Sequence, residues 1–220
     1  MKKEKTYLVH EMFLTLQGEG QYAGRRAVFI RFAGCNLWSG DPKHRARDAA
    51  RNHASCPLFC DTEFRGGTKM TAEQVVRNAK DLGAGGETFV VLTGGEPMLQ
   101  VDLKLLKKFR DEWVEVHVET NGSVKILNGN IRLIKHLVVS PKQDKTTLRV
   151  SRCDELKVVV PRYDPLAYAG VFIAKRLTVQ PEEDPDPLVW KQNIAFAKEF
   201  ILANPKWYLS LQVHKYLGVQ

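Results

Sequence analysis

The sequence lacks any hydrophobic run that approaches the roughly 18 apolar residues of a membrane span. It also lacks the apolar segment of a secretion signal, because its first residues, Met1–Lys5, are mostly charged. Internal repeats, low-complexity tracts and domain linkers are absent too, so residues 1–220 are expected to form a single domain. With 44% hydrophobic residues, such a chain can bury one substantial core. We therefore expect a cytoplasmic protein that does not enter a membrane.

Cysteine is scarce, with only four residues in the chain. A disulfide framework is not expected in a cytosolic protein, where thiols are kept reduced, and metal binding or catalysis is the better interpretation. The formal charge of +8 is compatible with an acidic partner such as nucleic acid or an anionic metabolite. The basic residues are spread along the chain and form no single tail, so charge alone does not select a function.

Strand and helix patterns alternate along most of the chain. Apolar runs at strand spacing predict strands at residues 8–15, 27–32, 88–92, 114–118, 137–139, 156–160, 176–179 and 207–211. Helical patterns cover residues 71–82, 101–112 and 187–203, and Thr71 with Gln74 forms a capping box at the first. Alternation of this kind predicts right-handed crossovers and a parallel sheet. The strands that can form the parallel sheet number about six, which is too few for an eight-stranded barrel. We therefore predict an α/β fold with an open partial (β/α)6-type barrel.

Polar clusters follow the predicted strands. They are Thr93–Pro97, Glu119–Gly122, Ser140–Lys142 and Gln180–Glu183. A further irregular segment, at about residues 33–67, follows the first barrel strand and carries three of the four cysteines. Ligands of α/β folds bind at the carboxyl ends of the strands, so we expect one site assembled from all five segments.

The three cysteines of the irregular segment are Cys35, Cys56 and Cys60, separated by twenty and then three residues. Soft thiolates select zinc, copper(I) or iron–sulfur clusters. A structural zinc site commonly uses two close pairs of ligands, whereas this segment has one close pair and Cys153 is far away in sequence. Three thiolates on one loop suit a four-iron cluster with one open iron. Spacing alone also leaves a zinc site or unpaired structural thiols open.

The residues around these cysteines carry a resemblance. Phe32–Leu37, Cys60–Thr62 and Thr93–Pro97 are similar to the motifs of the radical S-adenosylmethionine superfamily. Thr15–Gly20 and Leu211–Lys215 resemble the 7-carboxy-7-deazaguanine synthase family in particular, and the resemblance covers nearly the whole chain. The usual cysteine spacing of the superfamily is three residues and then two, so the spacing here is a departure. His44 and His53 are weaker candidates for a replacement ligand.

The resemblance implies a [4Fe–4S] cluster on Cys35, Cys56 and Cys60 that binds S-adenosylmethionine. The cofactor would supply a 5′-deoxyadenosyl radical, so no catalytic side chain is expected. The implied reaction converts 6-carboxy-5,6,7,8-tetrahydropterin to 7-carboxy-7-deazaguanine with loss of ammonia, a step of queuosine and 7-deazapurine biosynthesis. Thr62 would bind Mg²⁺, which prefers hard oxygen ligands. The expected partners are the pterin, an electron donor such as flavodoxin or ferredoxin, and a second copy in a homodimer, with no direct contact to nucleic acid.

The resemblance also implies which residues bind the cofactor and which bind the substrate. The expected cofactor-binding residues are Gly94, Gly95, Glu96, Glu119, Asn121, Ser140, Pro141, Lys142, Gln180, Pro181, Glu182 and Glu183. The expected substrate-binding residues are Leu16, Gln17, Gly18, Glu19, Arg31, Thr93, His214 and Gln220. Arg31 lies in an otherwise apolar strand, where a buried charge needs a partner; by resemblance that partner is the carboxylate of the substrate, and otherwise the side chain faces solvent.

Two other functions are considered. One is a radical S-adenosylmethionine enzyme with another substrate, such as an activase that forms a glycyl radical on a protein. The Leu16–Gly20 segment resembles activases less than synthases. The other is a basic, zinc-dependent nucleic-acid-binding module, which would bind zinc without iron and lose affinity steeply with salt. The lack of a second close cysteine pair argues against it.

Overall fold

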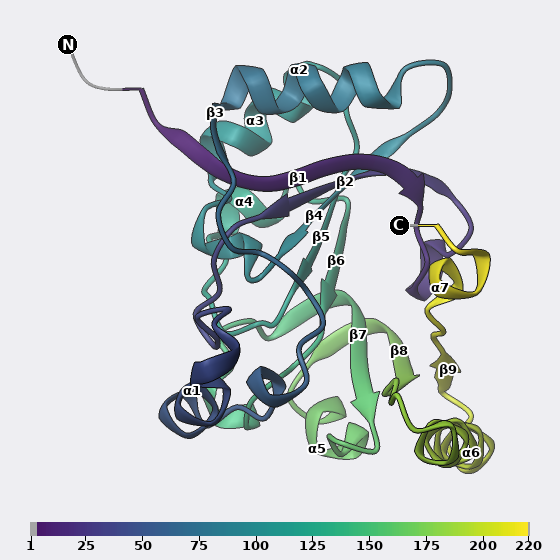
Figure 1. The fold of residues 1–220 in the computed structure, drawn as a ribbon. Helices are drawn as coiled ribbons and strands as arrows, with labels where there is room; N and C mark the ends of the chain where they lie inside the picture. The colour runs from purple at the N-terminus through teal and green to yellow at the C-terminus, as the bar shows by residue number, and fades with distance from the viewer. Residues whose placement is uncertain (1–3, 220) are drawn as a thin grey trace.

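The computed structural model describes residues 4–219. Within them, nine strands form one sheet in the order β3-β1-β2-β4-β5-β6-β7-β8-β9 (Figure 1). Neighbouring strands from β2 to β9 run parallel, whereas β1 pairs antiparallel with both β2 and β3. The sheet does not close on itself, so the predicted open partial barrel with parallel strands is confirmed.

The element bounds follow the predicted alternation closely. The strands are β1 (Thr6–Leu16), β2 (Arg26–Phe32), β3 (Thr68–Thr71), β4 (Phe89–Gly94), β5 (Val116–Thr120), β6 (His136–Val139), β7 (Arg152–Val160), β8 (Ile173–Pro181) and β9 (Trp207–Leu209). The helices are α1 (Arg45–Asn52), α2 (Ala72–Gly83), α3 (Leu103–Asp111), α4 (Asn128–Ile131), α5 (Pro165–Ala169), α6 (Pro187–Ala203) and α7 (Val213–Leu217). The capping box at α2 is present: the Thr71 hydroxyl accepts from the Gln74 N–H at 3.2 Å, and the Gln74 side chain accepts from the Thr71 N–H at 2.8 Å.

Several elements have no counterpart in the predicted pattern. β3 has four partly or fully exposed residues without apolar alternation. α1 has the sequence RARDAARN and lacks an apolar stripe. Both depend on contacts with other elements, because β3 pairs with β1 and α1 packs against the 3₁₀ turn Cys56–Leu58. β1 also differs from the prediction of parallel strands, since it is an antiparallel extension at the edge of the barrel.

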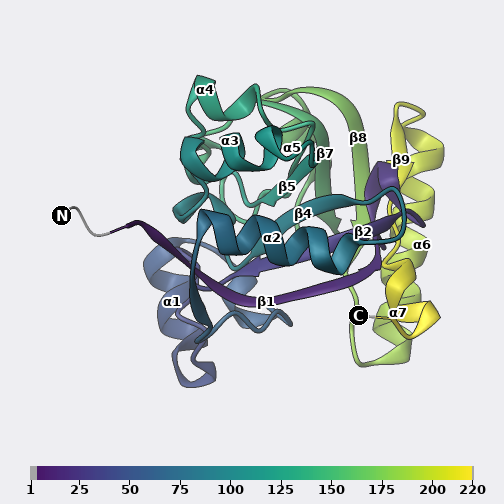
Figure 2. The ribbon, with the colours of Figure 1, turned by 90° about the horizontal axis from the view of Figure 1, so that it is seen from above.

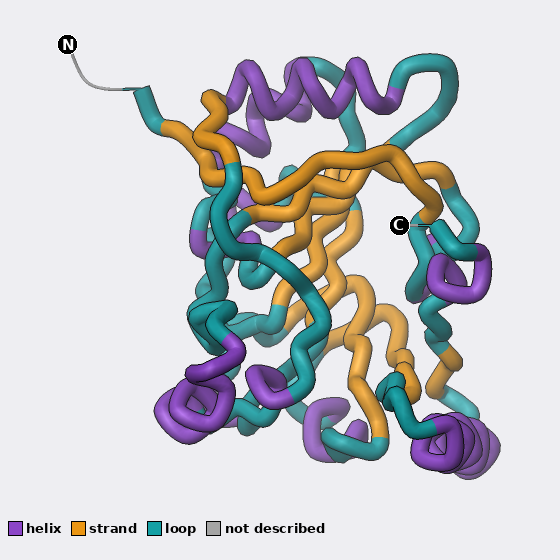
Figure 3. Tube along the Cα trace, in the orientation of Figure 1, coloured by secondary structure: helices purple, strands orange, loops and turns teal. Residues whose placement is uncertain are grey.

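The barrel strands are covered on both faces. Val90 and Leu92 of β4 point into the main core, which also contains Ile30, Val118 and Leu156. The alternate residues of β4, Phe89 and Val91, pack on the opposite face with Ala27. α2 packs against β1 and β2 (Figure 2), and α6 packs against β8 and β9 at the other end of the sheet (Figure 3). This two-sided burial explains the nearly continuous apolar runs of these strands.

Among residues 4–219, no helix combines the length and the apolar character needed to cross a membrane.

Candidate active site

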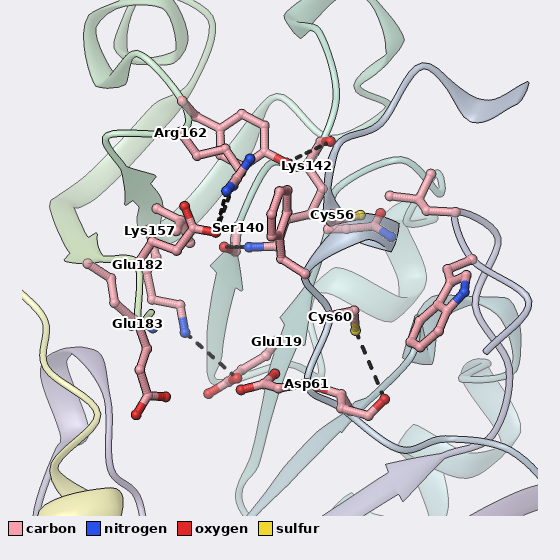
Figure 4. A pocket seen from close by; sticks show the side chains of 18 of the residues that line it. Cys56, Cys60, Asp61, Glu119, Ser140, Lys142, Lys157, Arg162, Glu182 and Glu183 are labelled. Atoms are coloured by element: carbon pink, nitrogen blue, oxygen red, sulfur yellow. Dashed lines mark hydrogen bonds and ion pairs between the residues drawn. The ribbon is translucent and has the colours of Figure 1, made fainter. Parts of the chain in front are cut away.

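A cavity of about 600 Å³ lies at the carboxyl ends of the parallel strands. The loop after β2 contributes its three cysteines, and β4, β5, β6 and β8 each contribute the residues at or just after their ends. Figure 4 shows Cys56 and Cys60 of the loop with Glu119, Lys142 and Glu182 from the strand ends. The predicted residues that line the cavity are Glu19, Cys35, Cys56, Cys60, Thr62, Gly94, Gly95, Glu119, Asn121, Ser140, Lys142, Gln180, Pro181, Glu182 and Glu183. The five segments singled out by sequence therefore meet at one place.

The three thiols border the same cavity and are close enough to affect one another's pKa. Among the described residues, no group of three or more His, Cys, Asp or Glu side chains is placed to hold a single metal ion. Three soft thiolates at one cavity are the ligand type that an iron–sulfur cluster uses. Burial raises the pKa of Cys35 to about 11 and that of Cys56 to about 12. Iron would offset this effect, because a metal binds the thiolate and releases the proton.

Gly94 and Gly95 are required by the packing of the chain itself. A Cβ on Gly94, whose φ is +141°, would lie 2.2 Å from the Phe32 carbonyl oxygen. A Cβ on Gly95 would lie 2.3 Å from the carbonyl oxygen of Gly34. The structure shows close approach of the cysteine loop at this glycine pair, and the expected contact of the pair with the cofactor stays a prediction. The pair thereby brings the end of β4 against Cys35.

A buried ion network forms part of the cavity wall. The Lys157 ammonium pairs with Glu19 and lies 3.9 Å from Glu119 Oε2. Glu19 also accepts from the side-chain amides of Gln212 at 2.9 Å and Gln180 at 3.3 Å. Burial would raise the pKa of Glu19, but the charge and hydrogen bond of Lys157 outweigh it and lower that pKa to about 2. The carboxylates likewise raise the pKa of Lys157 against the effect of burial. Both groups are therefore charged at neutral pH.

Comparison with known proteins places this site in a family. Residues 52–140 match the model of the Radical SAM superfamily. The chain is 41% identical to the 7-carboxy-7-deazaguanine synthase of Burkholderia multivorans over 97% of this chain and 99% of that protein. It is 40% identical to the 7-carboxy-7-deazaguanine synthase of Bradyrhizobium diazoefficiens over 98% of this chain and 100% of that protein. The chain belongs to the 7-carboxy-7-deazaguanine synthase family. Its fold is also that of QueE from Escherichia coli, with a TM-score of 0.68, 23% identity and 95% coverage of both chains.

Membership of the synthase family implies a [4Fe–4S] cluster and S-adenosylmethionine, as the sequence led us to expect. It also argues against the activase and the zinc-dependent nucleic-acid-binding module, because the full-length relatives share the synthase name. The roles of individual residues rest on where the structure places their side chains.

Glu96 and Pro141 do not line the cavity. Glu96 is fully buried, and its carboxylate accepts from the Thr120 hydroxyl at 2.7 Å and from the Asn121 N–H at 2.8 Å. Burial raises the pKa of this carboxyl. In this geometry Glu96 joins the ends of β4 and β5 and so positions Asn121. Its contact with the cofactor stays a prediction.

Gln17, Gly18 and His214 lie together beside the cavity, although they come from opposite ends of the chain. The Gln17 side-chain amide donates to Glu119 at 3.0 Å, and the Val213 N–H donates to the Gly18 carbonyl at 2.9 Å. A Cβ on Gly18 would lie 1.9 Å from His214 Nδ1, so only glycine lets the imidazole pack there. Leu16 ends β1 next to this group. Gln220 lies outside the described residues.

Arg31 and Thr93 are register partners on β2 and β4, and neither lines the cavity. The Arg31 guanidinium donates to Glu11 of β1 at 2.7 Å, and its side chain is 21% exposed. The protein itself therefore supplies the carboxylate partner that the sequence called for. Contact between Arg31 and the acid group of the substrate stays a prediction that this geometry does not support.

Lys142 and Thr62 border the cavity near the thiols. The Lys142 ammonium donates to the Ser140 hydroxyl at 2.7 Å, and within residues 4–219 no carboxylate lies within ion-pair distance of it. Burial lowers the pKa of Lys142. An anionic ligand would relieve this desolvated cation. Thr62 supplies one hydroxyl, so a magnesium ion there would need oxygen ligands from substrate and water.

The sequence analysis missed several cavity residues. Lys157, Arg162, Phe59 and Trp38 line the cavity without having been selected. The Arg162 guanidinium lies 3.4 Å from the centre of the Phe59 ring and pairs with Glu182 at 2.7 Å. One signal could have found Lys157: it is a lysine inside the apolar strand Leu156–Val160, the same kind of pattern that singled out Arg31.

Proposed function

We propose that this chain converts 6-carboxy-5,6,7,8-tetrahydropterin to 7-carboxy-7-deazaguanine with loss of ammonia. The observation that carries the proposal is a single cavity in which three thiols of one loop meet the polar ends of β4, β5, β6 and β8. Membership of the synthase family supports the same activity. The product would enter the biosynthesis of queuosine and other 7-deazapurines.

Cys35, Cys56 and Cys60 would hold the cluster, and the strand ends would hold S-adenosylmethionine beside it. The bound cluster and S-adenosylmethionine supply the radical chemistry, which a protein side chain cannot provide. The chain contributes position and shielding. The backbone at Gly94–Gly95 borders the thiols, and the partly buried Lys142 ammonium, which has no carboxylate partner among the described residues, is a cation available to an anionic group of the cofactor.

The ion network around Lys157 would face the substrate. A pterin is a flat ring with amide-like edges, and it requires paired donors and acceptors at fixed positions. Glu19 offers a carboxylate held by Lys157, while Gln180 and Gln212 offer amides on the same wall. Because the network is already hydrogen-bonded, its groups are oriented before the substrate arrives.

Further features belong to the same proposal. Mg²⁺ at Thr62 would bridge the protein and substrate oxygens. A one-electron donor such as flavodoxin or ferredoxin would reduce the cluster in the cytoplasm. We expect residues 1–220 to act as one radical S-adenosylmethionine domain and to form a homodimer, for which the exposed apolar side chains Leu188, Leu202 and Tyr208 offer a surface.

The direct test is anaerobic reconstitution with iron and sulfide, followed by incubation with reductant, S-adenosylmethionine, Mg²⁺ and the pterin. Formation of 7-carboxy-7-deazaguanine by the wild type but not by Cys56→Ala supports the proposal. An iron–sulfur spectrum with 5′-deoxyadenosine but without this product would mean a different substrate. A colourless protein that binds only zinc would contradict the radical mechanism altogether.

A further inference from the structure

The segment between Cys35 and Cys56 is folded around the cysteines. Its twenty residues contain a short 3₁₀ turn, Pro42–His44, followed directly by α1. α1 has few apolar residues, so its position depends on polar contacts with neighbouring parts of the same loop. Those contacts reach both sides of the cysteine set.

On the side of Cys35, α1 holds the backbone that follows this residue. Asp48 is buried and accepts from the Ser39 N–H at 2.9 Å. At the end of the helix, the Asn52 side-chain amide donates to the Leu37 carbonyl at 2.8 Å. Leu37 and Ser39, two and four residues after Cys35, are thereby fixed to the helix.

On the side of Cys56 and Cys60, the contact is a single arginine. The Arg45 guanidinium donates to the Pro57 carbonyl at 2.5 Å and to the Cys60 carbonyl at 3.1 Å. It also lies 4.3 Å from the centre of the Trp38 ring, which is 6% exposed and lines the cavity. One planar cation therefore contacts two carbonyls of the Cys56–Cys60 segment and the Trp38 ring.

Arg45 contacts the segment in which three residues, rather than the usual two, separate Cys56 from Cys60. The extra residue between Cys56 and Cys60 is accommodated by a 3₁₀ turn, Cys56–Leu58, and the Cys60 N–H donates to the Cys56 carbonyl at 2.9 Å. The Pro57 and Cys60 carbonyls are outside this turn's own hydrogen bonds, and both accept hydrogen bonds from the Arg45 guanidinium. The guanidinium thus fixes Pro57, next to Cys56, relative to Cys60.

We propose that α1 is a brace that sets the position of Cys60 and Cys56 relative to Cys35, and that Arg45 is its positioning residue. The inference rests on the proposed function only in that these thiols hold a cluster. Without Arg45, ordering the segment would cost conformational entropy each time iron binds. Groups that orient metal ligands typically change metal affinity by about 10- to 100-fold when they are removed. Lysine would replace this arginine poorly, because an ammonium cannot present two parallel N–H groups and stack on a ring.

The first measurement uses the metal-free protein, so that it does not depend on cluster assembly. Alkylation of each thiol by iodoacetamide is followed by mass spectrometry in wild type, Arg45→Ala, Arg45→Lys and Arg51→Ala. Arg51 is exposed on the last turn of the same helix, so its substitution removes the same charge without touching the cysteine segment. The buried thiol of Cys153 reports on general unfolding in every variant.

We expect alkylation of Cys56 and Cys60 to become several-fold faster in Arg45→Ala, because the segment opens more often without the two hydrogen bonds of the guanidinium. The rate at Cys153 should stay unchanged, Arg45→Lys should be intermediate, and Arg51→Ala should match wild type. Equal rates at Cys56 and Cys60 in all four proteins would overturn the proposal. Faster labelling of Cys153 together with the other thiols in Arg45→Ala and Arg45→Lys would also overturn it, because that result indicates loss of the fold.

The second measurement uses reconstituted protein and follows iron release to a chelator, together with the electron paramagnetic resonance spectrum of the reduced cluster. Arg45→Ala should release iron on the order of ten-fold faster than Arg51→Ala and give an altered spectrum. Identical release rates and spectra would count against the brace. A wild type that assembles no cluster would contradict the proposed function, whereas the difference in thiol labelling would remain.

Discussion

Lys157 shows how one side chain can couple the stability of the site to its chemistry. The residue is 6% exposed, and its ammonium lies between the carboxylates of Glu19 and Glu119. Breaking a buried ion pair by removing one partner leaves an uncompensated charge, which typically costs about 3–5 kcal/mol. The lysine is therefore structural as well as a candidate for substrate contact.

We predict that Lys157→Met lowers the free energy of unfolding by up to about 3–5 kcal/mol, because the Glu19 carboxylate, whose side chain is only 14% exposed, keeps its charge without the ammonium beside it. Urea unfolding monitored by circular dichroism measures the change. Lys175→Met is the matched control: Lys175 also forms an ion pair, with Asp154, but its side chain is 82% exposed. Its substitution should have a far smaller effect. Similar losses in both variants would show that the buried pair is not the reason.

Arg31 and Lys157 also show the limit of reasoning from single residues. Both are cations inside apolar strands, and the sequence shows that each needs a partner if it is buried. It does not show which partner, because Glu11 and Glu19 become neighbours of these cations only when β1 and the segment after it fold onto the sheet.

The turn after β4 is the element on which the cysteine loop is built. The Gly95 N–H donates to the Phe32 carbonyl at 3.3 Å, and the Glu96 N–H donates to the Gly34 carbonyl at 3.0 Å. The absence of a Cβ at Gly95 allows this approach. Glycine at the strand end is therefore needed to place Cys35, irrespective of any ligand.

We predict that Gly95→Ala destabilises the protein by about 1–3 kcal/mol, because the methyl group would overlap the Gly34 carbonyl and force the cysteine loop to shift. Gly170→Ala is a suitable control, since a Cβ at Gly170 meets nothing within 4 Å. Thermal unfolding would compare the two, and iron content after reconstitution would show whether Cys35 has moved. An unchanged melting temperature and full iron content in Gly95→Ala would contradict this account.

At the scale of the whole molecule, a buried histidine joins several strands on the inner face of the sheet. His117 of β5 is 2% exposed, and its ring lies 4.1 Å from that of Phe89 on β4 and 4.5 Å from that of Tyr22. Burial lowers its pKa to about 4, against the opposing effect of the Glu115 carboxylate. The neighbouring His136 and Arg25 also contribute to this lowering of the pKa of His117.

This depressed pKa predicts a loss of stability in mild acid. A folded state with a lowered histidine pKa binds fewer protons than the unfolded state, so stability is complete above the ordinary value of 6.5 and falls as the pH drops toward about 4. His117→Gln removes the titration and should flatten this part of the curve. Urea unfolding at several pH values between 7 and 4 measures it. Parallel curves for the two proteins would show that another group is responsible.

The sequence by itself determined the alternation of the main strands and helices from β2 to β9, the open barrel and the loop that carries the cysteines, but not the short elements β3 and α1. These features depend on local apolar spacing and on connections between neighbouring elements, which a linear pattern records. The sequence also predicted that the polar strand ends meet at one cavity, because parallel strands end at the same edge of a sheet.

Only the tertiary structure decided the partners of the charged groups. Arg31 is bound by Glu11, Glu96 joins two strand ends, Lys157 lies between two carboxylates, and Arg45 contacts the carbonyls of the cysteine segment. A side chain's charge and burial can be anticipated from its neighbours in sequence. Its partner depends on distances across the fold, and Lys157 and Glu19 are 138 positions apart in sequence. The specificity of the site lies in these long-range contacts, and a local pattern does not contain them.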